Sequence, residues 1–189
     1  TMAALKACQK KLSRYNISAS RFVATEACRR AENGLEFLAN VRSEIGMDID
    51  IISTEDEAKL AFTGCSALLT NDSKRAVVFD IGGGSTELMW VDVANGKAID
   101  DWLSVGFGVM NLSDKFGGSN HADITFNDMV NTLVDKLKDF DVANNISQTI
   151  ENSNVQLLST SGTVTTLAAI FMDLPRYERS KIDGITLPV

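Results

Sequence analysis

Three consecutive glycines, Gly82, Gly83 and Gly84, interrupt the clearest strand pattern of the chain, between "AVVFDI" and "STELMWVDV". A glycine in a strand costs about 0.5 to 1 kcal/mol relative to alanine, so three in a row indicate a bend, a bulge or the close approach of a ligand to the backbone. Successive amides that point the same way form a concave anion site. Together with Ser85, this loop is predicted to bind phosphate, and a plain hairpin turn is the alternative.

The residues on either side of the glycines add a possible metal site. Asp80 precedes the loop and Glu87 follows it, and both carboxylates could hold Mg²⁺ through water. The loop is not a P-loop, because no Gly-Lys-Ser/Thr sequence opens a helix. Nor is it a dinucleotide fingerprint, because a strand follows where a helix should.

A second candidate loop lies in "STSGTVTTLA", where a strand ends and a helix begins at Ser161, Gly162 and Thr163. Small residues at a helix N-terminus expose unpaired amides at the positive end of the helix dipole, which suits an anion. An ordinary N-cap is the alternative. The two loops together could clamp a polyphosphate.

Glu57 is the candidate acid or base, because it lies in the first turn of a helix directly after a strand. Thr54 and Glu57 also have the spacing of a capping box, which is the alternative role. Arg29 follows a strand end in "ATEACRRAEN", and its guanidinium suits a phosphate, although a surface ion pair would also explain it. Histidine chemistry is not expected, because the single histidine, His121, lies in a polar loop.

The composition narrows the class of protein. The chain has 189 residues, of which 44% are hydrophobic, enough for one domain or two small ones. Its net charge of −7 argues against a nucleic-acid binder, since such proteins neutralise phosphates with clustered Lys and Arg. Three widely spaced cysteines indicate a reducing cytoplasm rather than a disulfide framework or a zinc site. The sequence has no run of 18 apolar residues, so no membrane span is predicted.

The hydrophobic periodicity predicts the elements that must position these residues. Helices and strands alternate over about the first 60 residues, and an antiparallel meander and further helices follow. We therefore predict two units, 1–60 and 61–189, with a helix over 55–69 as the connection. The predicted strands are 20–25, 47–53, 75–81, 85–93, 98–105 and 155–161, and the other main helices are 2–15, 33–45, 126–140 and 162–172.

The helix predicted over 126–140 carries an uninterrupted apolar stripe that we interpret as core packing rather than a cofactor site. Residues from 174 to the end are predicted to form a loop. The stripe consists of Phe126, Met129, Val130, Leu133, Val134, Leu137 and Phe140.

Five segments resemble one family in order along the chain. They are "ATEACRRAEN", "IISTEDEAKLAFTG", "VVFDIGGGSTEL", "VGFGVMNLSDKFG" and "STSGTVTTLAAI". They closely resemble the exopolyphosphatase and guanosine pentaphosphate phosphohydrolase family, within the actin-like (ribonuclease H-like) ATPase superfamily. The resemblance implies an α/β fold with mixed sheets flanked by helices and parts of two domains.

The resemblance also implies roles for the candidate residues. Glu57 falls where the family's catalytic base activates water, and Arg29 where an arginine contacts phosphate. The acids that position Mg²⁺, or another divalent cation, or water correspond to Asp80 and Glu87. The phosphate cradle corresponds to Gly82, Gly83, Gly84 and Ser85, and the second phosphate contact to Ser161, Gly162 and Thr163.

The implied activity is release of the terminal phosphate from inorganic polyphosphate or guanosine pentaphosphate in the cytoplasm, with no nucleic-acid or membrane partner. Full-length relatives are often homodimers, and the sequence leaves the oligomeric state open. Two rivals remain: an actin-like or chaperone-like nucleotide-binding ATPase, and a non-catalytic binder of guanosine tetraphosphate or polyphosphate.

Two departures from the family pattern qualify the resemblance. The family's first phosphate loop, a D-x-G-S-N-S type sequence, should precede residue 1, and Asp183 stands where a histidine is common. We therefore expect a central fragment, formed by the end of a first actin-like domain and the beginning of a second. This fragment is expected to be inactive alone.

Overall fold

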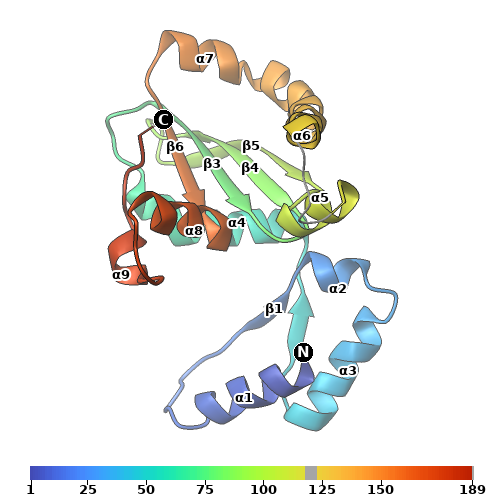
Figure 1. Cartoon of the computed structure of the whole chain (residues 1–189). Coiled ribbons are helices and arrows are strands. Elements are labelled where there is room, and N and C mark those ends of the chain that lie inside the picture. The colour runs from blue at the N-terminus through green and yellow to red at the C-terminus, as the bar shows by residue number, and fades with distance from the viewer. Residues whose placement is uncertain (118–122, 189) are drawn as a thin grey trace. The chain divides into compact units, whose positions relative to one another are not determined.

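The computed structural model describes residues 1–117 and 123–188 and divides into two compact units, Thr1–Glu57 and Ala58–Val189 (Figure 1). His121 lies outside the described residues. Within them, no helix is both long and apolar enough to cross a membrane.

The first unit is a two-stranded parallel sheet with helices packed on it. Its order is α1 (Met2–Leu12), β1 (Phe22–Ala24), α2 (Glu26–Arg30), α3 (Gly34–Ile45) and β2 (Ile49–Ile51). Phe22 pairs with Ile49 in the sheet. A core around Val41 and Ile45 of α3 is completed by Phe22 and Ile49. The predicted alternation of helices and strands is confirmed here, whereas the short α2 was not predicted.

The segment after β2 forms α4 (Thr54–Cys65), which a 3₁₀ turn, η1 (Ser66–Leu68), extends. Ser53 caps this helix, because its hydroxyl accepts a hydrogen bond from the Asp56 amide at 3.0 Å and donates one to the Asp56 carboxylate at 2.8 Å. The first of these bonds satisfies one of the orphan amides at the helix start. The capping-box interpretation of Thr54 and Glu57 is therefore wrong.

The second unit is built on a four-stranded mixed sheet. Its strands are β3 (Arg75–Ile81), β4 (Thr86–Asp92), β5 (Ala98–Val105) and β6 (Val155–Thr160), in the order β5-β4-β3-β6. The predicted meander of β3, β4 and β5 is confirmed as antiparallel, and β6 pairs with β3 in parallel.

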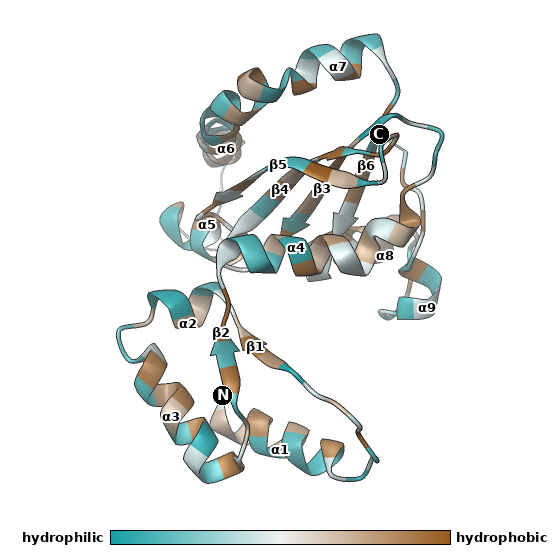
Figure 2. Cartoon of the chain, turned by 180° about the vertical axis from the view of Figure 1, so that it is seen from behind, coloured by the Kyte–Doolittle hydropathy of each residue, from teal (hydrophilic) through white to brown (hydrophobic). Residues whose placement is uncertain are grey.

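Helices cover both faces of this sheet (Figures 1 and 2). Besides α4, the helices of this unit are α5 (Val109–Lys115), α6 (Asp123–Asn144), α7 (Ile146–Asn152), α8 (Ser161–Phe171) and α9 (Arg179–Ile182). On one face, Val78 and Met89 pack with Ala58 and Cys65 of α4. On the other, Trp90 packs with Phe140 of α6.

Two predictions need correction in the second unit. The stripe of α6 was predicted to be core, but only Phe140 is buried, whereas Phe126, Val130 and Val134 are 64%, 41% and 55% exposed. The C-terminal end of α6, at Phe140, is the part that packs on the sheet. Periodicity identifies the apolar face of a helix but not which part of that face is covered. Residues 174–188 are not all loop, because α9 forms there and buries Ile182.

Candidate functional site

The first unit brings Arg29 and Glu57 together. Because β1 and β2 run parallel, their carboxyl ends lie at the same edge of the sheet, and the helices that follow them, α2 and α4, begin side by side. Arg29 Nη2 donates to Glu57 Oε2 at 2.8 Å, and Arg29 Nη1 donates to the Ile52 carbonyl at 2.7 Å. Both charged side chains are largely buried. The structure therefore joins the predicted acid and the predicted arginine in one hydrogen-bonded pair.

Glu26 is a third member of this cluster, and the sequence analysis did not identify it. Arg29 donates to Glu26 Oε2 from Nη2 at 3.2 Å and from Nε at 3.4 Å. Burial alone would lower the pKa of Arg29, but hydrogen bonds and charge from Glu57 and Glu26 raise it overall. Arg29 is thus firmly cationic, and most of its N–H groups already have acceptors.

In the second unit, Asp80 and Glu87 occupy directly opposite positions on β3 and β4. Opposite residues share one face of a sheet, so the row continues from Glu87 to Ser104 on β5 and from Asp80 to Thr160 on β6. Glu87 is only 2% exposed, and Ser104 Oγ donates to its Oε1 at 3.0 Å. The buried hydroxyl of Thr160 has no hydrogen-bond partner in the described part of the chain.

This polar row fits a divalent cation. Two carboxylates directly opposite each other repel, unless a proton or a cation lies between them. Mg²⁺ commonly uses one or two carboxylates and completes its shell with water and substrate phosphates. Among residues 1–117 and 123–188, no cluster of three or more His, Cys, Asp or Glu side chains could hold a metal. The two carboxylates therefore suit a cation whose coordination shell is completed by water and a phosphate. They do not suit a cation that is held by protein ligands alone.

The triglycine loop has a defined orientation. The carbonyls of Gly82 and Gly83 accept hydrogen bonds from the Val109 and Met110 amides of α5 at 3.0 and 2.9 Å. All described peptide bonds are trans, so each N–H points opposite to the preceding carbonyl. The amides of Gly83, Gly84 and Ser85 consequently face away from α5. Within the described residues, these three amides have no acceptor.

The second predicted loop lies beside the first. Ser161 Oγ and Thr163 Oγ1 donate to the carbonyl of Ile81, the residue before Gly82, at 2.6 and 2.8 Å. Both hydroxyls are therefore used for packing the loops together. The amides of Gly162 and Thr163 lie in the first turn of α8, where a helix provides no intrahelical acceptor.

The sequence analysis also missed Gly108 and Asn111. A Cβ on Gly108 would lie 2.4 Å from the Gly82 carbonyl oxygen, so this position must be glycine for the loop to pack. Asn111 donates to the Gly84 carbonyl at 2.8 Å. The spacing "GFGVMN" is visible in the sequence, but no local pattern shows which distant loop it contacts.

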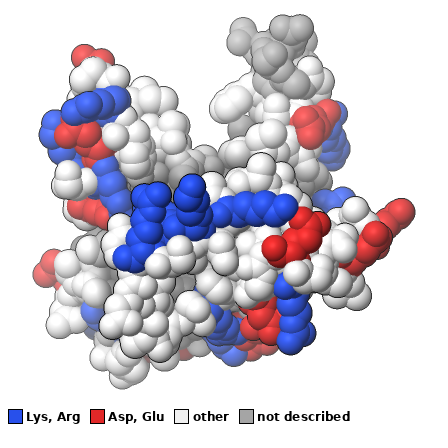
Figure 3. All heavy atoms as spheres, turned by 90° about the horizontal axis from the view of Figure 1, so that it is seen from below, with Lys and Arg blue, Asp and Glu red and all other residues white. Residues whose placement is uncertain are grey.

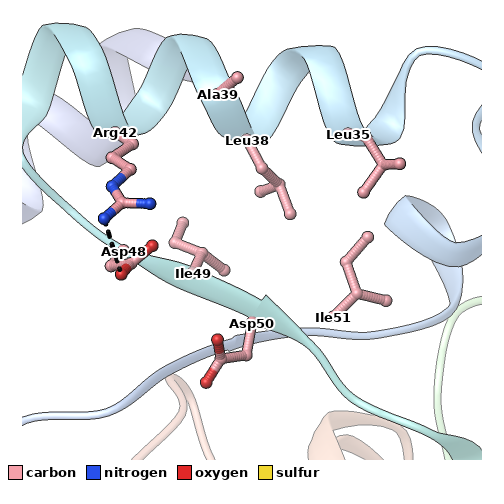
Figure 4. Close-up of a pocket in the computed structure, with 8 residues that line it drawn as sticks. All are labelled: Leu35, Leu38, Ala39, Arg42, Asp48, Ile49, Asp50 and Ile51. Carbon is pink, nitrogen blue, oxygen red and sulfur yellow. Dashed lines mark ion pairs between the residues drawn. The ribbon is translucent and has the colours of Figure 1, made fainter.

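A separate groove in the first unit carries none of the predicted chemistry. It has a volume of about 430 Å³ and lies between α3 and β2 (Figure 4). Apolar side chains such as Leu38 and Ile49 form its walls, and an ion pair of Arg42 with Asp48 at 3.7 Å lies at one side. None of the eight lining residues was predicted as a site residue.

Basic side chains gather on one face of the molecule (Figure 3). The first 21 residues contribute five Lys and Arg and no acid, and Lys6 of α1 pairs with Glu44 at 2.7 Å. The side chains of Lys10 and Lys11 are exposed. Exposed charges of this kind are commonly solvated, so this face is not assigned to the site.

A model described as the Ppx/GppA phosphatase family matches residues 1–184. A curated relative, the bifunctional 3-dehydroquinate synthase/phosphatase of Fusobacterium nucleatum, is 29% identical over 96% of this chain and 27% of its own length.

Two solved structures are similar over nearly the whole chain. The Ppx/GppA enzyme of Aquifex aeolicus is 27% identical with a TM-score of 0.70, over 95% of this chain and 56% of its own. An exopolyphosphatase from Cytophaga hutchinsonii, 24% identical, has the same fold with a TM-score of 0.79 over 96% and 56%. The chain thus spans about half the length of these solved structures. The predicted α/β fold of the actin-like ATPase type is confirmed.

Proposed function

Because this chain belongs to the Ppx/GppA phosphatase family, we propose that the protein is a phosphoanhydride hydrolase that releases the terminal phosphate from inorganic polyphosphate or guanosine pentaphosphate. The observation that carries the proposal is the orientation of the triglycine loop. Its carbonyls turn to α5, which leaves the amides of Gly83, Gly84 and Ser85 for an anion. An acidic chain can hold phosphate in this way without clustered Lys and Arg.

In this proposal Glu57 orients the attacking water and accepts its proton. The Arg29 guanidinium holds the Glu57 carboxylate in one orientation and is the candidate for a contact to phosphate. Ser161, Gly162 and Thr163 provide the second phosphate contact through their backbone, since both hydroxyls of this segment donate to the Ile81 carbonyl.

Asp80 and Glu87 would hold the divalent cation, for which we propose Mg²⁺. The ion would neutralise charge on the phosphoryl group that is transferred. Ser104 would hold the Glu87 carboxylate toward the cation through its hydrogen bond.

The proposal extends to the whole protein. We propose that residues 1–60 and 61–189 belong to two actin-like domains, that the protein acts in the cytoplasm, and that these 189 residues alone release no phosphate. Metal-dependent phosphate release from the 189-residue chain would contradict the last point.

A phosphate-release assay on the full-length gene product tests the function. Polyphosphate, guanosine pentaphosphate and ATP are compared, each with and without Mg²⁺. Mg²⁺-dependent release from either of the first two supports the proposal. Release from ATP alone would identify a nucleotide-driven ATPase instead, and binding without release would identify a non-catalytic binder.

A further inference from the structure

The side chain of Asn111 joins three backbone segments of the second unit. Its Nδ2 donates to the carbonyls of Gly84 at 2.8 Å and Gly106 at 2.9 Å. Its Oδ1 accepts from the amide of Gly108 at 2.7 Å. Asn111 thus ties the triglycine loop to the end of β5 and to the start of α5.

The three loop carbonyls are held by two different means. Those of Gly82 and Gly83 accept bonds from the first-turn amides of α5, so the N-terminus of this helix is occupied by the loop itself. The carbonyl of Gly84 is held by the Asn111 side chain. Among the described residues, Asn111 is the one hydrogen-bond donor to this carbonyl.

The peptide between Gly84 and Ser85 is the one that needs such a restraint. Glycine adopts φ and ψ values that other residues avoid, so a peptide plane next to it can flip at little cost. A flip here would replace the Ser85 amide with the Gly84 carbonyl oxygen. The loop would then present a partial negative charge to an anion.

We infer that Asn111 is a positioning residue for the phosphate loop, because it fixes the Gly84–Ser85 peptide with its amide toward the anion. This inference rests on the proposed function, which makes the loop a phosphate site. Both Nδ2 hydrogens are used by Gly84 and Gly106, so Asn111 acts through the loop and does not donate to the substrate.

Steady-state kinetics of the full-length gene product provide the first test. In Asn111→Ala we expect KM for polyphosphate or guanosine pentaphosphate to rise about tenfold, with kcat within about twofold, because the loop binds substrate and transition state alike. Asn111→Asp keeps the acceptor for Gly108 but loses both donors, and it should raise KM at least as much. A KM within about twofold of wild type in both variants would overturn the inference.

The matched control is Asn144→Ala. Asn144 also donates two hydrogen bonds from a partly buried amide, to Asp101 at 2.7 Å and to the Phe140 carbonyl at 3.0 Å. In the described part of the chain it has no hydrogen bond to the triglycine loop or to Ser161–Thr163. We expect its KM to equal that of wild type. If KM rises as much in Asn144→Ala as in Asn111→Ala, the effect of Asn111→Ala is a general loss of packing and the inference fails. Thermal unfolding identifies variants that do not fold. If Asn111→Ala does not fold, the KM of Asn111→Asp, whose side chain has the same size as asparagine, tests the inference alone.

A second measurement separates this inference from the proposed function. Inorganic pyrophosphate is titrated into the protein while the amide NMR signals of Gly83, Gly84 and Ser85 are followed. We expect them to shift in wild type and to need about tenfold more pyrophosphate in Asn111→Asp. If both results are obtained with a protein that releases no phosphate, the proposed function fails and the inference stands. If phosphate is released but wild type and variant titrate alike, or if the wild-type signals do not shift, the inference fails.

Discussion

Arg29 Nη2 and Glu57 Oε2 lie 2.8 Å apart, although the two residues are 28 positions apart in the sequence. The hydrogen bond orients the carboxylate of Glu57 and provides the largely buried guanidinium of Arg29 with an acceptor. A helix-cap role for Glu57 would not require this partner. In the proposed function, this pair holds the Glu57 carboxylate in place for proton transfer.

Glu57→Gln tests that role directly. The variant keeps the size of the side chain and removes its ability to accept a proton, so kcat for phosphate release should fall by about 10²- to 10⁴-fold. The measurement is steady-state phosphate release by the full-length gene product. Glu36→Gln, on the exposed surface of α3, is the control and should behave like wild type. Near-normal turnover of Glu57→Gln would leave Glu57 with a structural role.

Glu26→Gln tests whether Arg29 also contacts phosphate. The bonds from Arg29 to Glu26, at 3.2 and 3.4 Å, are longer than its bond to Glu57. Glu26 is therefore the partner that an incoming phosphate would displace. Removing its charge should lower KM for the substrate by about three- to tenfold and leave kcat nearly unchanged.

Glu32→Gln controls for the loss of one acid near α2, because Glu32 is exposed. It should leave KM unchanged. If Glu26→Gln raises KM or leaves it unchanged, Arg29 serves to anchor Glu57 and does not contact the phosphate.

The metal site gives a third prediction. Activity of the gene product should be lost with EDTA and return with Mg²⁺. Ser104→Ala removes the 3.0 Å hydrogen bond to Glu87 and should raise the Mg²⁺ concentration for half-maximal activity by about tenfold, as partners of metal ligands commonly do. Saturating Mg²⁺ should restore most of kcat. Ser43→Ala, whose exposed hydroxyl bonds only the Asn40 carbonyl in the described residues, is the control. An unchanged Mg²⁺ requirement in Ser104→Ala would argue against this role.

Local patterns in the sequence were sufficient for much of the fold. The three strand runs between Arg75 and Val105 have short turns between them, and such runs form a meander from local information alone. The placement of the glycine loop at a strand end follows from the same pattern. The sequence pattern does not predict how much of α6 packs on the sheet, because periodicity identifies the apolar face of the helix but not the length of the surface that covers it.

The site shows the same limit more sharply. Glu57 and Arg29 could each be proposed from their positions after strands, but their hydrogen bond depends on the parallel pairing of β1 with β2. The bond from Asn111 to Gly84 spans 27 residues. No local spacing encodes such pairs, so Ser104 and Asn111 emerge only from the assembled fold. Glu26 differs, because it lies three positions before Arg29, a spacing at which helical side chains meet.

Gly108 provides a prediction about the packing of the loop that does not depend on the reaction. A Cβ at this position would meet the Gly82 oxygen at 2.4 Å, the Gly83 carbonyl carbon at 2.5 Å and the Gly84 nitrogen at 2.6 Å. These are backbone atoms, so the loop itself must move. Gly108→Ala should destabilise the protein by about 1–3 kcal/mol in urea unfolding, as overpacking does. Gly106→Ala is the matched control, since its Cβ would meet nothing within 4 Å, and its stability should change by less than about 1 kcal/mol. Equal losses of stability in the two variants would mean that the close contact between position 108 and the loop is not the cause of the destabilisation.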